Sequence, residues 1–208
     1  MNPPSCHGLY AITDTVLIPD DRLTDAVEQA ILGGARLVQY RDKSHDAARR
    51  LAQAKALNEL CQRYNLPLIV NDDVELAAQI GAAGVHIGKD DPTLATARAR
   101  LGATALIGVS CYDRLDLALD AARAGADYVA FGAFFPSLTK PGEIRAPLEL
   151  LRHARSVLRV PIVAIGGIMP DNGQLLLDAG ADSLAVVSGV FGQADIQAAA
   201  RRYAALFV

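Results

Sequence analysis

The chain has 208 residues, of which 51% are hydrophobic and 21% charged, and its formal net charge is −3. This length fits one domain with a full core, and no second domain is expected within residues 1–208. The composition is that of a globular protein, and the small negative charge provides no basic excess for binding nucleic acid.

The three cysteines, Cys6, Cys61 and Cys111, form no CxxC pair and no cluster with histidine. This pattern argues against a disulfide framework and a structural zinc site, and it fits a reducing compartment. The N-terminus lacks a charged segment followed by a long apolar stretch, and no run has the length of a membrane-spanning helix. We therefore expect a cytoplasmic protein that does not associate with membranes.

Short aliphatic runs alternate with alanine- and leucine-rich segments of helical period. In chain order, strands are expected at 9–13, 37–41, 67–71, 84–87, 105–110, 128–131, 161–165 and 183–187. Helices are expected at 23–32, 46–64, 74–80, 93–101, 115–124, 148–158, 172–178 and 196–207. Strict alternation implies parallel strands joined by helical crossovers.

Four stretches repeat the same pattern between a helix and the next strand: GGARLVQY, GAAGVHIG, AGADYVAFG and AGADSLAVV. Glycine there supplies the left-handed residue that ends a helix, and the repetition indicates equivalent stacked units. Eight units favour an α/β fold, a (β/α)8 TIM barrel formed by residues 1–208. The alternative is an open doubly wound sheet, but no GxGxxG follows the first strand and no P-loop is present.

Polar residues near the carboxyl ends of buried strands indicate a site at the barrel mouth, because such strands should otherwise be apolar. In VQYRDK, Gln39, Arg41 and Lys43 lie on one face of the expected strand, and Val38 and Tyr40 lie on the other. Three long polar groups would be costly in a dry core. We expect them in a wet cleft.

Aspartates follow the third and fourth expected strands. Asn71 and Asp72 end the third, and Asp91 lies in GVHIGKDD after the fourth. In a barrel these neighbouring ends bring Asp72 and Asp91 to one rim, where two carboxylates can hold one Mg²⁺ whose other ligands are water and diphosphate. The alternative is helix capping, which we favour for Asp73 and Asp90.

Two further polar residues lie in expected strands, His86 in the fourth and Ser110 at the end of the fifth. A lone histidine in a strand is more often a packed, hydrogen-bonded residue than a base, and we favour that interpretation. No histidine and aspartate follow Ser110 at a recognisable spacing, so Ser110 is interpreted as a hydrogen-bond donor to a ligand. Gly108 lies two residues earlier on the same face.

Two regions predict phosphate binding. The stretch FFPSLTKPG, residues 134–142, carries Ser137, Thr139 and Lys140, which can donate to an anion, although such residues also make ordinary turns. The seventh and eighth strands end in IGG and VVSG, and their glycines let backbone N–H groups approach an anion. Phosphate sites of barrels often follow these two strands.

Taken in order, these segments resemble the thiamine phosphate synthase family. The resemblance runs from YAITD at 10–14 to VVSGVFG at 186–192, and it rests on VQYRDK, IVNDDVELA, GVHIGKDD, IGVSCYD, DYVAFGAFFPSLTKPG, VPIVAIGGI and ADSLAVVSGVF. Members of the family are transferases of thiamine biosynthesis. They join a hydroxymethylpyrimidine diphosphate to a thiazole phosphate, or to its carboxylated form, and release pyrophosphate with Mg²⁺. The partners implied are these small phosphorylated molecules, and a homo-oligomer is left open.

The resemblance also implies roles for individual residues. The catalytic cations would be Arg41, Lys43 and Lys140, and the single Mg²⁺ of each subunit would be held by Asp72 and Asp91. The pyrimidine diphosphate would be contacted by Gln39, Tyr40, Arg41, Asp42, Lys43, Asn71, Ser110 and Lys140. The thiazole phosphate would be contacted by Ser137, Leu138, Thr139, Gly167, Val187 and Ser188.

The charges fit this chemistry. Loss of pyrophosphate builds negative charge that Mg²⁺ and the cations can stabilise, and the electron-rich aminopyrimidine supports a carbocation, so the family's dissociative route needs no protein nucleophile. Two positions depart from the family pattern. Lys89 stands where glutamine is common and adds a positive charge beside the expected metal site, and Ser137 stands where threonine is common.

Three alternatives remain. A thiazole tautomerase-like relative has the same barrel but does not need the diphosphate and metal groups. A non-catalytic regulatory barrel would bind thiamine intermediates, since barrels host many functions. A sugar-phosphate isomerase would need a carboxylate or lysine base over the barrel centre. Asp72 and Asp91, together with Arg41, Lys43 and Lys140, favour the synthase.

Overall fold

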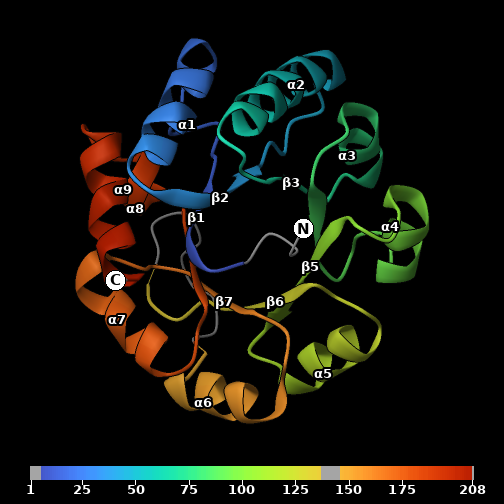
Figure 1. Ribbon diagram of the computed structural model, residues 1–208, viewed down its shortest axis with the longest axis vertical. Coiled ribbons are helices and arrows are strands. Elements are labelled where there is room, and N and C mark those ends of the chain that lie inside the picture. Colours follow the sequence, from blue (N-terminus) through green and yellow to red (C-terminus); the bar gives the residue numbers. More distant parts are fainter. Residues whose placement is uncertain (1–5, 137–145, 208) are drawn as a thin grey trace.

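Eight parallel strands form a closed barrel in sequence order, because β1 pairs with both β2 and β8 (Figure 1). The computed structural model describes residues 6–136 and 146–207. The predicted (β/α)8 barrel is thereby confirmed. The strands are β1 (Gly8–Ile12), β2 (Ala35–Tyr40), β3 (Leu68–Asn71), β4 (Gly84–Ile87), β5 (Leu106–Tyr112), β6 (Tyr128–Phe131), β7 (Ile162–Ile165) and β8 (Ser183–Val186).

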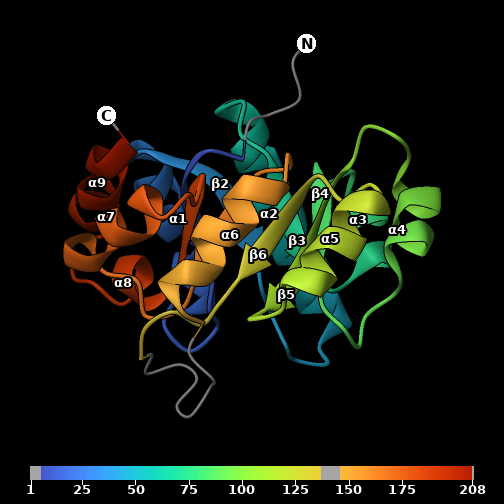
Figure 2. The ribbon, with the colours of Figure 1, turned by 90° about the horizontal axis from the view of Figure 1, so that it is seen from below.

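The helices form a ring around the strands, which is visible along the barrel in Figure 1 and from the side in Figure 2. They are α1 (Leu23–Leu32), α2 (Ala47–Arg63), α3 (Val74–Ile80), α4 (Leu94–Leu101), α5 (Leu115–Arg123), α6 (Leu148–Val157), α7 (Pro170–Asp178), α8 (Ser188–Phe191) and α9 (Ile196–Ala204). All the expected helices are present. The four-residue α8 was not expected, because its sequence is too short for a helical period.

The helix ends agree in part with the expected caps. Asp73 caps α3 by accepting a hydrogen bond from the backbone N–H of Leu76 at 2.9 Å, as expected. The expectation that Asp90 caps the next helix is wrong. Thr93 caps α4, since the chain runs through a turn after Asp90 before the helix begins. The expected helix-ending glycines have positive φ at Gly34, Gly81, Gly125 and Gly180.

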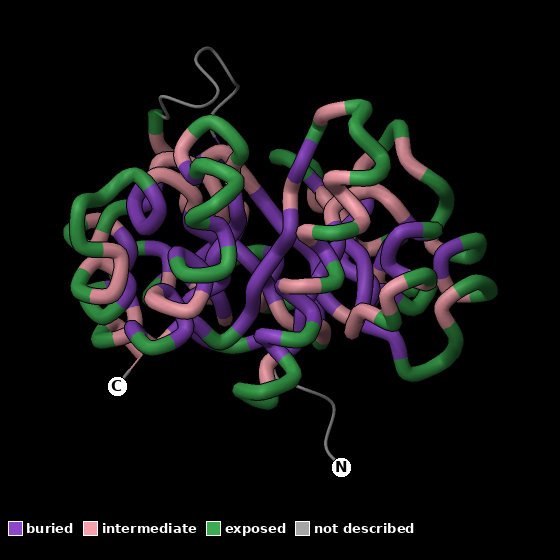
Figure 3. The backbone as a smooth tube through the Cα atoms, turned by 90° about the horizontal axis from the view of Figure 1, so that it is seen from above, coloured by how far each residue is buried: buried purple, intermediate pink, exposed green. Residues whose placement is uncertain are grey.

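The core has two layers. The barrel interior is filled by side chains that include Tyr10, Leu37, Ile69 and Tyr128, and a larger apolar layer lies between the strands and the helices. Figure 3 shows buried segments gathered towards the centre of the molecule and exposed segments at its periphery. Burial raises the pKa of all three cysteine thiols to about 12, which leaves them protonated. No helix of the described residues is long and apolar enough to cross a membrane.

The repeated AGAD sequence uses its aspartate in the same way in both copies. Asp127 Oδ2 accepts a hydrogen bond from the backbone N–H of Ile107 at 2.8 Å and pairs with Arg98 at 2.6 Å. In the second copy, Asp182 Oδ2 makes the same bonds with Ile162 at 2.7 Å and Arg155 at 2.8 Å. Each aspartate thus ties the start of one strand to the preceding strand and to a neighbouring helix.

We expect Asp127→Asn to lower the free energy of unfolding by about 1–3 kcal/mol, because a partly buried charged hydrogen bond loses its charge. Urea denaturation measures the change. Asp120→Asn is the matched control, since Asp120 pairs with Arg123 on the surface, where the loss should be below about 0.5 kcal/mol. Equal losses in the two variants would contradict a structural role for the repeat.

Candidate active site

The two faces of β2 have different environments. Val38 and Tyr40 belong to the layer between the barrel and the helices, as the alternation predicted. Gln39 lies on the other face, inside the barrel, and is 3% exposed. Arg41 and Lys43 follow at the carboxyl rim, where the Arg41 side chain is 30% and that of Lys43 is 61% exposed. Polarity therefore increases from the barrel interior towards its mouth.

Arg41 is held at the rim by the end of β1. Its Nη1 donates to Asp14 Oδ2 at 3.3 Å, and its backbone N–H donates to Thr13 Oγ1 at 2.9 Å. Asp14 is fixed in turn, because its Oδ1 accepts from the backbone N–H of Val16 at 2.9 Å. The sequence interpretation gave Asp14 no role, although it ends the YAITD segment.

Tyr40 and Asp42 are engaged on the outer side of β2. The Tyr40 hydroxyl lies 2.9 Å from Gln53 Oε1 and 3.3 Å from Asp42 Oδ2. Asp42 accepts from the Ser44 backbone N–H at 2.7 Å and from Arg49 at 2.9 Å. Burial opposes ionisation of Asp42, but these hydrogen bonds outweigh it and lower its pKa. The two side chains therefore do not join Gln39 and Arg41 at the barrel mouth.

Asp72 and Asp91 lie close together at the rim. Asp72 has φ +64°, and its backbone N–H donates to the His86 carbonyl at 2.8 Å, while its carboxylate pairs with Lys43. Asp91 Oδ2 accepts from the Gly88 backbone N–H at 2.7 Å. Burial, followed by the neighbouring Asp72 carboxyl, raises the pKa of Asp91. A cation between the two carboxylates would relieve this repulsion.

A ready-made metal centre is not present within the described ranges, since they contain no group of three or more His, Cys, Asp or Glu side chains arranged for a metal ion. The pair of Asp72 and Asp91 fits Mg²⁺, which takes few protein oxygens and keeps water or phosphate oxygens as its other ligands. The Mg²⁺ site stays a prediction.

A chain of hydrogen bonds crosses the barrel interior below this rim. Gln39 Nε2 donates to the Tyr10 hydroxyl at 2.8 Å, and the Tyr10 and Tyr128 hydroxyl oxygens are 2.9 Å apart. The Tyr128 hydroxyl lies 3.1 Å from His86 Nδ1, and His86 Nε2 lies 2.8 Å from Ser110 Oγ. The interpretation of His86 as a packed, hydrogen-bonded residue is confirmed.

The His86 ring is stacked on Tyr128, with ring centroids 5.6 Å apart and planes at 23°. Burial lowers the pKa of His86 to about 4, so the imidazole is neutral at pH 7. Gly108 pairs with both His86 and Tyr128 in the strand register and provides room for the tyrosine. A Cβ atom at Gly108 would lie 2.0 Å from Tyr128 Cζ.

The predicted phosphate loop is described only at its start. Ser137, Leu138, Thr139 and Lys140 lie outside the described residues. The preceding residues lie along the end of β7, where the Phe135 backbone N–H donates to the Gly166 carbonyl at 3.0 Å. A Cβ atom at Gly167, which has φ +62°, would lie 2.3 Å from the Pro136 carbonyl oxygen.

Val187 and Ser188, the predicted phosphate contacts after the eighth strand, join the barrel to α8. Val187 packs against the apolar barrel interior, and Ser188 begins the helix. Gly189 has a packing role, because a Cβ atom there would lie 2.0 Å from the Tyr203 hydroxyl. Close packing against α9 therefore accounts for this glycine.

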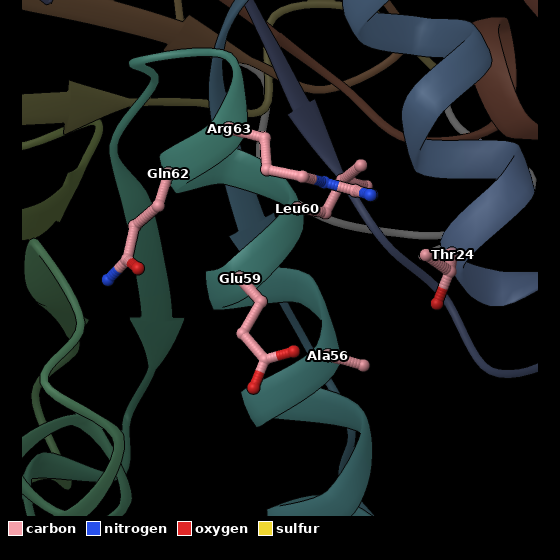
Figure 4. A pocket seen from close by; sticks show the side chains of 6 residues that line it. All are labelled: Thr24, Ala56, Glu59, Leu60, Gln62 and Arg63. Atoms are coloured by element: carbon pink, nitrogen blue, oxygen red, sulfur yellow. The ribbon is translucent and has the colours of Figure 1, made fainter.

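A separate pocket lies on the outside, between α1 and α2 (Figure 4). It contains none of the predicted site residues. Its lining consists of Thr24, Ala56, Glu59, Leu60, Gln62 and Arg63.

The barrel and its rim define an enzyme class that handles anionic substrates, since arginine, lysine and paired carboxylates gather at the carboxyl ends of parallel strands. A family model described as "Thiamine monophosphate synthase" matches residues 9–190. The chain belongs to the thiamine monophosphate synthase family.

Similar proteins cover almost the whole chain. The chain is 55% identical over 199 residues to thiamine-phosphate synthase of Nitrosococcus oceani, covering 96% of this chain and 92% of that protein. It is 56% identical over 201 residues to the protein of that name from Thioalkalivibrio sulfidiphilus, with 97% and 95% covered. Among solved structures, thiamine phosphate pyrophosphorylase from Pyrococcus furiosus has a TM-score of 0.88 and 34% identity, with 99% and 98% covered.

We expect Gly108→Ala to disturb the interior hydrogen-bond chain, because the added methyl group overlaps the Tyr128 ring. The loss in unfolding free energy should be about 1–3 kcal/mol. Thermal and urea denaturation measure the loss. An unchanged stability for Gly108→Ala would contradict this packing.

Proposed function

We propose that the chain joins an aminopyrimidine diphosphate to a thiazole phosphate, forming thiamine phosphate and releasing pyrophosphate. The observation that carries the proposal is the gathering of Arg41, Lys43, Asp72 and Asp91 at one rim of the barrel. The high identity to proteins called thiamine-phosphate synthase, along nearly the whole chain, supports it.

In this proposal, the pyrimidine ring enters the barrel interior between Gln39 and Ser110, and its diphosphate lies at the rim. Arg41 and Lys43 bind the diphosphate, with Asn71 at the end of β3 beside them. Lys140 adds a third cation. The thiazole phosphate is contacted by Ser137, Leu138, Thr139, Gly167, Val187 and Ser188. Tyr40 and Asp42 support β2 from the outside, where their side chains bond to Gln53 and Arg49 of α2.

Asp72 and Asp91 would hold one Mg²⁺. The two carboxylates suit the ion because they lie close together. Burial is the main cause of the raised pKa of Asp91, and the neighbouring Asp72 carboxyl raises it further. Bound there, the ion would supply positive charge against the diphosphate. Lys43, which pairs with Asp72 in the structure, would then be available to the diphosphate oxygens.

The reaction is a substitution at the carbon that carries the diphosphate. The C–O bond breaks, pyrophosphate leaves with the electron pair, and the thiazole nitrogen forms the new C–N bond. Arg41, Lys43 and Lys140 stabilise the negative charge that develops on the leaving group. The closely packed barrel interior limits the access of water to the cationic pyrimidine. No protein nucleophile is required.

The tautomerase-like and regulatory alternatives account less well for this site, because neither needs two carboxylates next to Lys43 and Arg41. A cytoplasmic location is part of the proposal, and it rests on the free, buried Cys6, Cys61 and Cys111.

The first test is a coupling assay with purified protein, both phosphorylated substrates and Mg²⁺. We expect thiamine phosphate and pyrophosphate in equal amounts, and no product after EDTA until Mg²⁺ is restored. Liquid chromatography measures thiamine phosphate, and a pyrophosphate assay measures the second product. Binding of thiazole phosphate without coupling would instead favour the tautomerase-like or regulatory function.

Asp72→Asn should lower kcat by at least about tenfold and raise the Mg²⁺ concentration needed for half activity, because one of two carboxylates is lost. Steady-state rates over a Mg²⁺ titration test this. Asp90→Asn removes the same charge next to Asp91 from an exposed residue and should leave the titration unchanged. The same response in both variants would contradict the assignment.

A further inference from the structure

The hydrogen-bond chain inside the barrel can be followed hydrogen by hydrogen. Tyr10 is 1% exposed, and its hydroxyl receives a hydrogen bond from Gln39 Nε2. Its own hydrogen must therefore go to another acceptor, and among the described residues the Tyr128 hydroxyl oxygen, 2.9 Å away, is the one in reach. With Gln39 in this orientation, both buried hydroxyls are satisfied when Tyr10 donates to Tyr128.

The next two bonds follow from this direction. Tyr128 accepts from Tyr10 and so donates its single hydrogen to His86 Nδ1, 3.1 Å away. The neutral imidazole then carries its hydrogen on Nε2, which donates to Ser110 Oγ at 2.8 Å. The Ser110 hydroxyl hydrogen is not used by this chain and can be donated to a ligand. At the other end, Gln39 Oε1 is not used by this chain.

Every group is also satisfied when the hydrogen bonds run in the reverse direction, but all of them must then be reversed together. It requires the Gln39 carboxamide to be turned, so that Oε1 accepts from Tyr10, and it puts the His86 hydrogen on Nδ1. Ser110 would then donate to His86 and could only accept from a ligand. The orientation of Gln39 and the donor role of Ser110 are thus coupled across the barrel through three buried side chains.

We propose that Tyr10, Tyr128 and His86 are positioning residues that fix one direction of hydrogen bonding between Gln39 and Ser110. The inference rests on the proposed function. Gln39 Oε1 then accepts from the amino group of the pyrimidine, and Ser110 donates to a ring nitrogen. An oxo group in place of the amino group presents an acceptor to Gln39 Oε1 and is rejected. The hydrogen-bond chain thus selects aminopyrimidines over oxopyrimidines.

The direction is tested by NMR of protein labelled with 15N at its histidine rings. The chain has four histidines, and the signal lost in His86→Gln identifies His86. We expect a neutral His86 with its hydrogen on Nε2. A hydrogen on Nδ1, or on both nitrogens at pH 7, would overturn the proposal.

The coupling to the ligand is tested by Tyr128→Phe, with Tyr10→Phe as the second variant in case the first does not fold. Each removes one link and leaves Gln39 and Ser110 in place. We expect KM for the aminopyrimidine diphosphate to rise about tenfold, the preference over the 4-oxo analogue to fall by a similar factor, and KM for thiazole phosphate to stay the same. An unchanged preference in both variants would overturn the positioning role.

Ser183→Ala is the matched control. It also removes a buried hydroxyl, which donates to the Gly8 carbonyl at a distance of 2.7 Å and takes no part in the hydrogen-bond chain. Both KM values and the preference for the aminopyrimidine should therefore stay unchanged. If the unaltered protein does not couple the substrates, the proposed function is wrong. The His86 tautomer then still shows whether the hydrogen-bond chain runs from Gln39 to Ser110 in the direction inferred.

Discussion

A polar side chain buried inside an eight-stranded barrel is removed from bulk water, and the strand backbone is already paired, so its partners are side chains of other strands. In this protein that constraint joins Gln39, Tyr10, Tyr128, His86 and Ser110 into one chain across five strands. Each link determines what the next can donate. The polar interior is therefore a specified arrangement and cannot be changed one residue at a time.

The same reasoning separates the two sides of β2. Gln39 and Arg41 serve the barrel interior and its mouth, while Tyr40 and Asp42 are bonded to Gln53 and Arg49 of α2. Alternation along the strand gives neighbouring residues opposite environments. Family resemblance alone assigned all of them to one substrate, and the alternation explains why adjacent residues in a motif serve the site in different ways.

The elements of the fold could be predicted because apolar periodicity and repeated helix-ending glycines are local signals. Local signals also predicted that Gln39 and Tyr40 face opposite sides of β2 and that Asp73 caps a helix. Asp90 was assigned wrongly, since two adjacent aspartates do not reveal where the next helix begins. Tyr10, by contrast, looks like an ordinary core residue in the sequence, because its hydroxyl partners come from other strands.

Gly108 shows what non-local packing adds. In the sequence it is a small residue two positions before Ser110, yet in the barrel it lies between His86 and Tyr128 and allows the tyrosine ring to cross β5. Charge determines which groups of the site lie at the rim and which lie inside the barrel. Arg41, Lys43 and the two carboxylates need water or counter-charges and stay at the rim, whereas neutral hydroxyls and a neutral imidazole can be satisfied inside. A substrate with an uncharged heteroaromatic ring and a diphosphate tail matches this gradient, ring inward and phosphates outward. The chemistry of the substrate is thus reflected in where the barrel keeps its charges.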